Sequence, residues 1–516
     1  MGSDTQSGAD MPAAIAHARD LARRGDLRTA IRTLETLAGS GADAAPAIFE
    51  IGNLTKAAGL YDQAEAAYRK VLETHPGSIE AATNLANVLS AKGQTDTAIA
   101  ILGNVRSVVQ GNPIVDISLA DALYASGRIA DALSAYDTLA GRYPGFAAVH
   151  ANRGEALARL GRHADAIAAL DRAAALDPAN PDIVRNRGFS RLALGELEAG
   201  FADYEARLDP GLPQAPVRLN LTAPRWDGAL PLDGPLLVVA EQGLGDEIRF
   251  AAAVPALIAR GADVVVECDP RLVDLFSASF RGSLPSTRIL AFDRRRDGQR
   301  PVFDYASLPE APAAWIEVGS LPHRLGLPAG EPLAPAGYLA PPEVKTQLLR
   351  ARLKAETGGR PLVGLCWGSA AADRNRARFY PTLEAWTAIL DRSDAVFVDL
   401  QYVESDSDRA ALERISGAEI LQTAGIDKRD DLTAAACLAA AMDAVVGVSS
   451  SVTAMAAAVG TPTVEVTPER TWVPLVGGRD AWLGRITAAY PDVPGDWDQA
   501  MARASTALDA ALAGTD

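Results

Sequence analysis

The sequence predicts an α-helical solenoid followed by an α/β region that is built from two parallel-sheet halves. Two observations support this fold class. Glycines recur at a strict interval of 34 residues through about the first 210 residues, and short β-branched runs alternate with helical segments through the last 300. The chain has 516 residues, which is enough for about three domains. We predict the solenoid at 11–210, the first α/β half at 232–340 and the second at 345–516.

The composition excludes several classes of partner. The formal net charge is −16, so the positive field that a nucleic-acid or anionic membrane partner requires is absent. No apolar run reaches the length of about 18 residues that a membrane span needs, and no signal-peptide pattern is visible. The three cysteines lie far apart in apolar segments, which favours buried thiols in a reducing compartment. We therefore expect a soluble cytoplasmic protein.

The repeat in the solenoid region is defined by four positions. A small residue precedes each glycine by seven positions, another follows it by five, and a leucine or tyrosine follows it by nine. The glycines are Gly25, Gly59, Gly93, Gly127, Gly161 and Gly195. Each unit is expected to be two helices joined at the glycine, with the small residues allowing close approach and the large ones filling the gap to the next unit. Because no unit can bury its face alone, the six units should stack.

This pattern resembles the tetratricopeptide repeat, and the resemblance implies a concave groove lined by the first helix of each unit. The residue nine positions before each glycine should face this groove, and three of the six are asparagines: Asn84, Asn152 and Asn186. An asparagine amide both donates and accepts hydrogen bonds, so such a row suits the backbone of an extended peptide. The arrangement is similar to the asparagine ladder of O-GlcNAc transferase. The alternative is that these are solvated polar positions.

The α/β region contains two sets of strands, after a proline-rich linker at 209–234 and a second such segment at 332–343. The first set is expected at about 235–240, 263–268 and 288–292, with helices near 246–260 and 270–280. The second set is expected at about 361–366, 395–400, 418–422, 444–448 and 462–466. Alternating strands and helices predict parallel sheets with right-handed crossovers. The cleft between two such halves is a natural ligand site.

Three stretches carry a resemblance to a known enzyme family. They are "VVAEQGLGDEIRFAAAVPALIARGADVVVECDPRLVDLF", "VGSLPHRLG" and "VGLCWGS". Together they resemble the heptosyltransferase-type glycosyltransferases of the GT-B fold over about residues 232–467. More narrowly, the chain resembles bacterial proteins that fuse tetratricopeptide repeats to such a domain, including flagellin-modifying glycosyltransferases that use nonulosonic acids. The resemblance implies two Rossmann-like halves, with the acceptor bound by the first and a nucleotide sugar by the second.

The glycine loop "EQGLGDEIRF" at 241–250 is the predicted acceptor side. Its acidic residues would repel a phosphate, but a carboxylate can accept the proton of a hydroxyl group. In the enzymes that this region resembles, the aspartate of the "GD" pair is the general base, and Asp246 occupies that position. A helix cap is the alternative role for Asp246. The acceptor side also includes Glu241, Gln242, Gly243, Gly245 and Arg249, with Arg249 either orienting Asp246 or forming a surface ion pair.

The stretch "GVSSSVTAMAAAVGTP" at 447–462 is the first predicted donor-binding segment. Hydroxyl and free N–H groups at a helix N-terminus bind anions, so the phosphate candidates are Ser449, Ser450, Ser451 and Thr453. Ordinary helix capping is the alternative. The family often has a histidine in this segment, whereas this sequence has Met455 and Ala456 there.

The stretch "CWGSAAADRNRARFYP" at 366–381 is the second donor-binding segment. Its arginines, Arg374, Arg376 and Arg378, suit a phosphate or a sugar carboxylate because the guanidinium group donates two parallel hydrogen bonds. A solvated charge run is the alternative. The resemblance places Trp367 and Ser369 where the strand-end loop meets the donor, and Gln401 is expected near the base or the sugar.

No metal or cofactor is predicted, since the histidines are dispersed and no HExxH or CxxC motif occurs. We predict a metal-independent protein O-glycosyltransferase that modifies Ser or Thr of a protein held by the repeats. The resemblance narrows the acceptor to flagellin and the donor to a CMP-nonulosonic acid of the pseudaminic type. One alternative is an enzyme similar to O-GlcNAc transferase that uses UDP-GlcNAc on other proteins. The other is a repeat scaffold whose transferase domain is inactive.

Overall fold

The computed structural model describes residues 11–39, 44–212, 215–241, 243–281, 288–297, 300–326, 331–368, 379–403 and 406–514. The chain forms two compact units, Met1–Leu157 and Ala158–Asp516. The predicted solenoid lies on both sides of this division, so the last repeats belong to the same compact unit as the sheets. The domain ranges given above stay predictions.

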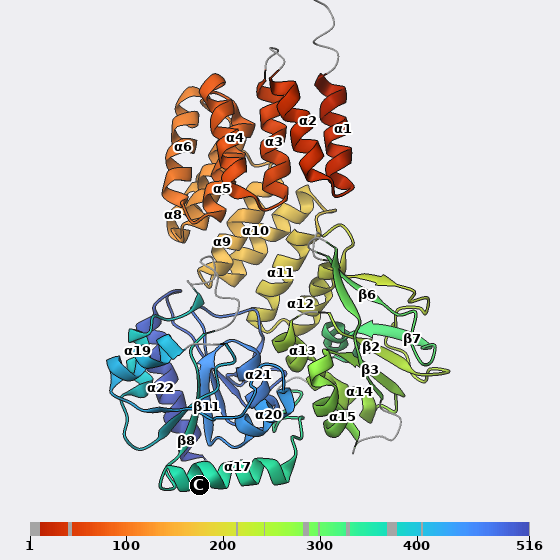
Figure 1. The fold of residues 1–516 in the computed structure, drawn as a ribbon, viewed down its shortest axis with the longest axis vertical. Helices are drawn as coiled ribbons and strands as arrows, with labels where there is room; N and C mark the ends of the chain where they lie inside the picture. Colours follow the sequence, from red (N-terminus) through yellow and green to blue (C-terminus); the bar gives the residue numbers. More distant parts are fainter. Residues whose placement is uncertain are drawn as a thin grey trace, which may run out of the picture. The chain divides into compact units, whose positions relative to one another are not determined.

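The repeat region consists of helix pairs (Figure 1). In the first unit the helices are α1 (Met11–Arg23), α2 (Leu27–Ala38), α3 (Ala45–Ala57), α4 (Tyr61–Thr74), α5 (Ile79–Ala91), α6 (Thr95–Val108), α7 (Pro113–Ala125) and α8 (Ile129–Arg142), and α9 (Ala147–Arg159) follows. The second unit continues with α10 (His163–Leu176), α11 (Pro181–Leu194), α12 (Leu197–Tyr204) and the 3-10 turn η1 (Glu205–Leu208). Each repeating glycine lies between the helices of its pair with a positive φ, 88° at Gly25 and 75° at Gly59. Glycine adopts this left-handed conformation without the steric cost that a Cβ imposes.

The small residues of the pattern allow the close helix contacts that the sequence predicts. A Cβ atom on Gly52 of α3 would lie 2.6 Å from Cε1 of Tyr68 on α4. Tyr68 is fully buried, and its hydroxyl donates to Asn53 Oδ1 at 2.9 Å. The glycine therefore makes room for the aromatic ring of the paired helix.

The first parallel sheet of the second unit has the strand order β4-β3-β2-β7. Its strands are β2 (Leu236–Val239), β3 (Val264–Cys268), β4 (Arg288–Ala291) and β7 (Ala314–Glu317). The helices and 3-10 turns around it are α13 (Leu244–Phe250), η2 (Ala251–Ala253), α14 (Val254–Ala259), η3 (Pro270–Leu272), α15 (Val273–Arg281), η4 (Val318–Ser320) and α16 (Leu321–Leu325). The helix predicted at 246–260 is interrupted by η2, because Pro255 at the start of α14 has no N–H for the preceding turn.

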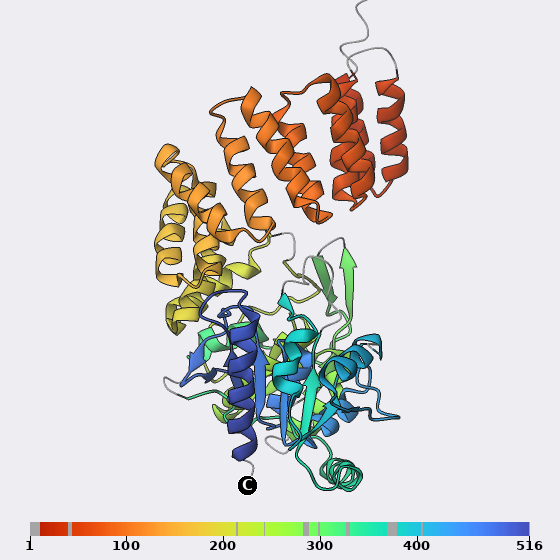
Figure 2. The same ribbon diagram turned by 90° about the vertical axis from the view of Figure 1, so that its left-hand side faces the viewer.

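The second sheet has eight strands in the order β10-β9-β8-β11-β12-β15-β14-β13. They are β8 (Leu362–Cys366), β9 (Val396–Asp399), β10 (Ile420–Leu421), β11 (Ala444–Val448), β12 (Thr463–Val466), β13 (Leu475–Val476), β14 (Arg479–Asp480) and β15 (Ile486–Ala489). All neighbours pair in parallel except at β13 and β14. The helices around it are α17 (Glu343–Glu356), α18 (Thr387–Leu390), α19 (Asp406–Ser416), α20 (Leu432–Ala440), α21 (Ser451–Ala458) and α22 (Trp497–Ala513), coloured blue-green to dark blue in Figure 2. The predicted solenoid followed by an α/β fold is confirmed.

A third, small sheet was not predicted. It consists of β1 (Val217–Leu219), β6 (Arg300–Asp304) and β5 (Arg294–Asp297). Strand β1 lies within the predicted linker at 209–234, so that segment is part of the fold. Its later residues are also fixed, since Arg225 donates to Glu317 at 2.8 Å and the Trp226 N–H donates to the Trp315 carbonyl at 2.7 Å.

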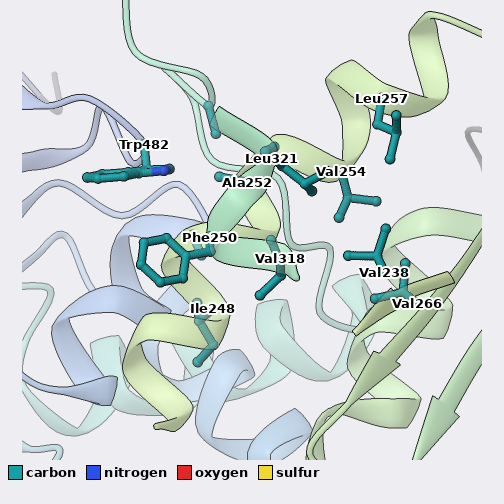
Figure 3. Close-up of a cluster of buried hydrophobic side chains, with 14 of the residues drawn as sticks. Val238, Ile248, Phe250, Ala252, Val254, Leu257, Val266, Val318, Leu321 and Trp482 are labelled. Atoms are coloured by element: carbon teal, nitrogen blue, oxygen red, sulfur yellow. The ribbon is translucent and has the colours of Figure 1, made fainter. Parts of the chain in front are cut away.

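One hydrophobic core joins the last repeat to both sheets. Figure 3 shows Ile248 and Phe250 of α13 between the strand residues Val238 and Val266 and the ring of Trp482. The Phe250 and Trp482 ring centroids are 5.5 Å apart, and Phe201 of α12 meets Trp482 edge-on at 5.7 Å. Helix α13 therefore lies at the centre of this core. Among the described residues, no helix has both the length and the apolarity that a bilayer crossing requires.

Candidate functional site

The second sheet has a topological switch point between β8 and β11, where a ligand crevice is expected at the carboxyl ends of the strands. Three segments reach this edge: Cys366 at the end of β8 with Trp367 after it, Gln401 after β9 and the serines after β11. The Cys366 thiol donates to Gln401 Oε1 at 3.2 Å and lies 3.7 Å from Ser450 Oγ. The predicted donor residues Gln401 and Ser450 are therefore brought together around Cys366.

Two of the predicted donor-binding residues are buried and make contacts within the fold. Trp367 is buried in the core of the second sheet with Trp386. Gln401 is also buried, and its amide oxygen accepts from the Gly368 N–H at 3.4 Å in addition to the thiol. The remaining predicted residues of this segment, Ser369, Arg374, Arg376 and Arg378, lie outside the described residues.

In the serine segment, some residues cap helix α21 and others are accessible at the surface. Ser450 is the N-cap of α21 and forms a capping box with Thr453, whose Oγ1 accepts from the Ser450 N–H at 3.1 Å. Thr453 is fully buried and donates to Glu465 of β12 at 2.9 Å. The capping role is therefore real for Ser450 and Thr453. Ser449 is exposed, and Ser450 and Ser451 are half-buried, so Ser449 has the most accessible of these side chains.

Asp246 lies in the first turn of α13 but does not cap it. The N-cap is Gly243, and no side chain of the described residues makes the capping hydrogen bond there. Asp246 is half-buried. Burial raises the pKa of its carboxyl above the ordinary value, Arg249 opposes this shift, and the nearby Glu241 and Glu465 add to it. A carboxylate whose pKa is raised accepts a proton more readily near neutral pH than an ordinary aspartate does.

The other two acids of the loop have structural partners. Glu241 makes a two-point ion pair with Arg207 of η1, at 2.8 and 3.1 Å, and accepts from the Gly319 N–H at 2.8 Å. Glu247 is buried and accepts from the Asp269 N–H at 2.7 Å. Burial raises the pKa of Glu247 to about 8. Asp246 thus combines partial exposure with a raised pKa, whereas Glu241 is held in an ion pair and Glu247 is buried. Gln242, in the same loop, lies outside the described residues.

Arg249 is buried, which excludes the surface ion pair considered for it. Its guanidinium lies 3.1 Å from Glu465 Oε2 and 3.0 Å from Asp480 Oδ2. Both carboxylates belong to the second sheet, whereas Arg249 belongs to a helix of the first. This ion-pair cluster therefore fastens α13 to β12 and β14.

The predicted acceptor and donor segments touch each other. A Cβ atom on Gly245 would lie 3.2 Å from the Ser451 nitrogen and 3.3 Å from its Cα atom. The glycine thus lets the first turn of α13 approach the first turn of α21, and this contact sets the acceptor loop beside the serine segment.

A pocket of about 270 Å³ opens next to this contact. Leu244 and Ser451 line it, together with Leu400, Tyr402, Leu432, Ala435, Leu438, Ala439, Val452, Met455 and three cations, Arg271, Lys428 and Arg429. Among the described residues that line it, none is acidic. Met455 lies where the family often has a histidine, so this wall is apolar. The lining of the pocket therefore combines apolar side chains with cationic ones.

The cations of this pocket were missed by the sequence reasoning. The run "GIDKRDDL" at 425–432 mixes charges of both signs, so it does not stand out as basic. In the fold, Lys428 is held by the Asp399 side chain at 3.0 Å, and Arg271 donates to the Arg429 carbonyl at 3.1 Å while pairing with Asp269 at 2.9 Å. In the described part of the chain, no group of histidine, cysteine or acidic side chains is arranged to hold a metal ion.

The predicted groove asparagines are engaged with their neighbours. In the first unit, Asn84 donates to Asn53 at 3.2 Å and accepts from Lys56 at 2.7 Å, and Asn152 donates to Asp121 at 2.7 Å. The bonds Arg19–Glu50, Asn53–Asn84, Asp121–Asn152 and Tyr124–Glu155 each join residues 31 positions apart, so they link adjacent repeats. We call this series the cross-repeat ladder. Asn186 lies on α11 in the second unit.

Comparison with known proteins identifies the helical region. One tetratricopeptide repeat model matches residues 15–79, 117–181 and 159–213, and a second such model matches 56–115. The predicted tetratricopeptide repeats are confirmed. Repeats of this class generally mediate protein–protein interaction.

One curated relative aligns with this chain over more residues than the tetratricopeptide repeats contain. "Protein FlbA" of Caulobacter vibrioides is 32% identical over 332 residues, which is 61% of this chain and 53% of the relative. The chain thus spans about half the length of that protein.

Solved structures match about a third of the chain. The tetratricopeptide-repeat protein TTC0263 of Thermus thermophilus is 24% identical, with a TM-score of 0.30 and coverage of 32% of this chain and 91% of that one. YrrB, described as a tetratricopeptide-repeat protein with an unusual peptide-binding site, is 21% identical, with a TM-score of 0.27 and coverage of 33% and 88%.

Proposed function

We propose that this protein is a metal-independent glycosyltransferase that moves a sugar from a nucleotide donor to a Ser or Thr hydroxyl of a protein. The observation that carries the proposal is the contact between Gly245 and Ser451, which sets the Asp246 loop beside a cation-lined pocket. An acceptor base and a donor pocket must adjoin for direct transfer, because the two reacting atoms have to come within about 3.5 Å of each other.

The proposed reaction is a single displacement at the anomeric carbon. The acceptor oxygen forms a bond to this carbon while the bond from the carbon to the donor phosphate oxygen breaks. The hydroxyl proton passes to the Asp246 carboxylate, and the phosphate leaves with the bonding electron pair. Lys428 and Arg271 line the pocket, and together with the N–H groups at the start of α21 they would offset the charge that develops on the phosphate.

The pocket suits the nucleotide part of the donor. A base is planar and largely apolar, and the lining of the pocket includes Leu432, Val452 and Met455. The phosphate is anionic, and the lining also includes Arg271, Lys428 and Arg429. Nucleotide recognition generally combines these two features.

The narrower proposal is that the acceptor is flagellin and the donor a CMP-nonulosonic acid, with transfer in the cytoplasm. It rests on the resemblance of the chain to flagellin-modifying fusion proteins. The tetratricopeptide repeats support a protein acceptor, since such repeats generally bind proteins, and the three buried free thiols suit a reducing compartment.

The transfer is tested by the intact mass of a candidate acceptor, such as flagellin, co-expressed with the wild-type chain or with Asp246→Asn. We expect a mass increase with the wild type, whose size identifies the sugar class. Asp246→Asn should lower the modified fraction at least about 100-fold, since it removes the base. Modification at the wild-type level by Asp246→Asn would disprove the base, and an inactive scaffold would leave every acceptor unmodified.

The donor pocket is tested by calorimetric titration of the protein with CMP and with UDP. Lys428→Ala should weaken binding of the preferred nucleotide about tenfold, because a charge-assisted hydrogen bond is lost. Lys345→Ala is the matched control, since it removes the same charge from an exposed position of α17. Equal affinity of Lys428→Ala and the wild type would contradict the pocket assignment, and preference for UDP over CMP would favour the UDP-GlcNAc alternative.

A further inference from the structure

The ion-pair cluster around Arg249 does more than fasten two sheets, because of where its members lie. Arg249 follows Asp246 by one helical turn, so both side chains lie on the same face of α13. Its partners Glu465 and Asp480 come from β12 and β14, at 3.1 and 3.0 Å. All three members of the cluster are buried.

Glu465 also connects this cluster to the start of α21. Its Oε2 atom accepts from Thr453 Oγ1 at 2.9 Å and lies 3.1 Å from Arg249 Nη2. Thr453 in turn accepts from the Ser450 N–H at 3.1 Å. A continuous chain of polar contacts therefore runs from the serine segment through Glu465 and Arg249 to the turn of α13 that carries Asp246.

We propose that Glu465 is a positioning residue that, through Arg249, sets the charge environment of Asp246 and ties it to the Ser450–Thr453 helix start. Arg249 is ion-paired with two carboxylates and is also close enough to Asp246 to act on it, so its single positive charge does not neutralise all three acids. Neutralising Glu465 would leave more of that charge to act on Asp246. The geometry is independent of any substrate, although its catalytic meaning rests on the function proposed above.

The charged groups around Asp246 come from several elements. Arg249 and Glu247 lie on α13 itself, Glu241 precedes it and is paired with Arg207 of η1, and Glu465 and Asp480 approach from the second sheet. The other elements packed against α13, which are α21, η2 and η4, have no charged residue in their sequences. Among these groups, Arg249 lowers the pKa of Asp246, while Glu241 and Glu465 raise it. Glu465 therefore acts on Asp246 in two ways: it holds Arg249, and it is a nearby like charge from the second sheet.

The proposal is tested by a titration that needs no substrate. In the infrared spectrum, the difference between the wild-type protein and Asp246→Asn isolates the carboxyl band of Asp246, and its midpoint is followed against pH. Glu465→Gln should lower this midpoint by on the order of one pH unit, because a repelling charge is removed and Arg249 is released from one partner. Asp480→Asn should shift it in the same direction through Arg249 alone.

The matched control is Asp443→Asn. Asp443 is a buried carboxylate that is paired with Arg350 and Lys354, and it lies at the opposite end of β11 from the serine segment, so its substitution perturbs a comparable ion pair away from Asp246. This control variant should leave the titration midpoint of Asp246 within about 0.3 pH units of the wild-type value. A midpoint in both Glu465→Gln and Asp480→Asn that equals the control value would overturn the proposal. If one of these variants does not fold, the other decides it.

The proposed function and this inference fail in different ways. A downward shift in Glu465→Gln establishes the coupling even if no acceptor is ever modified. An unshifted midpoint overturns the coupling even if Asp246→Asn abolishes glycosylation. If the proposed function and the coupling are both correct, Glu465→Gln should also move the acidic limb of the pH–rate profile of sugar transfer to lower pH. A purely structural defect would instead lower the transfer rate at every pH.

Discussion

Asp246 and Glu247 are neighbours in the sequence with different surroundings. Asp246 is half-buried at the contact between α13 and α21, whereas Glu247 is buried against the Asp269 backbone. The residue pattern alone shows both only as acids after a glycine turn, and it was the family resemblance that singled out Asp246. What separates them is which face of α13 each occupies, and that depends on tertiary packing rather than on local pattern.

Glu247 gives a pH-dependent stability that can be measured. Its pKa is raised from 4.5 to about 8, mainly by burial, so between these values the folded chain keeps a proton that the unfolded chain releases. The stability of the wild type therefore falls as pH rises through this window. Glu247→Gln should remove that slope, which is at most about 1.4 kcal/mol per pH unit.

The measurement can be confined to the second unit. All seven tryptophans lie after residue 225, so urea unfolding followed by tryptophan fluorescence reports on Ala158–Asp516 only. Glu80→Gln, at an exposed position of α5, serves as the control and should change nothing in this signal. An undiminished slope in Glu247→Gln would show that other groups cause the pH dependence.

At the scale of single elements, strands that are continuous apolar runs were predictable. Strands β2, β3, β8 and β11 are buried along their whole length and were located to within about two residues. Strand β7 was missed because its run "AWIE" is short and follows a proline- and alanine-rich stretch. The Arg-rich strand β5 was missed because three consecutive arginines do not resemble a strand of a hydrophobic core.

The helix pairs offer a matched pair of glycine substitutions. Gly52→Ala should destabilise the first unit by about 1–3 kcal/mol, because the new Cβ would meet the ring of Tyr68 at 2.6 Å. Gly103→Ala, within α6, meets no atom within 4 Å and should stabilise it by about 0.5–1 kcal/mol, since alanine favours the helix.

Both glycine variants can be compared by helical circular dichroism during urea unfolding, with tryptophan fluorescence marking the second unit separately. Equal midpoints for Gly52→Ala and the wild type would mean that α3 and α4 shift apart without cost. The small-residue positions would then not control the helix spacing.

At the scale of the whole molecule, the site was predictable in its parts but not in its assembly. The sequence indicated the Asp246 loop and the serine segment, because each follows a recognisable strand. It contained no signal for the Gly245–Ser451 contact or for the Arg249–Glu465 pair, which join residues 206 and 216 positions apart. The pocket cations were hidden for the same reason, since Arg271 and Lys428 come from different sheet halves.

The division of the chain has a consequence for truncation. The last repeat shares a hydrophobic core with the sheets through Phe201 and Tyr204. Arg207, which follows this repeat, forms an ion pair with Glu241 of the glycine loop. A chain that starts at Ala158 should keep the fluorescence-detected unfolding midpoint of the full chain to within a small shift. A chain that starts at residue 211 should lose more than about 3 kcal/mol of its free energy of unfolding, or fail to fold. The reason is that this truncation leaves buried Glu241 without its arginine and removes Phe201 and Tyr204 from the aromatic core.

Urea unfolding of both truncated chains, against the full chain, checks this expectation. Identical midpoints for the two truncations would show that α10–α12 add nothing to the second unit. An acceptor-binding role of the first unit is then best examined with the Ala158 chain, which leaves the Asp246 loop supported.

The buried tyrosines of the repeats alternate with leucines. Tyr68, Tyr136 and Tyr204 recur every 68 residues, and each contacts the residue 15 positions earlier: Asn53 at 2.9 Å, Asp121 at 2.5 Å and the ring of Phe189 at 5.8 Å. Two successive repeats therefore form one packing period. Each of these contacts lies within one helix pair, so inserting or removing a whole pair leaves the tyrosine contacts of the other pairs intact. A 34-residue change would nevertheless break the alternation of tyrosine and leucine, so 68 residues is the smallest block that keeps both the contacts and the alternation.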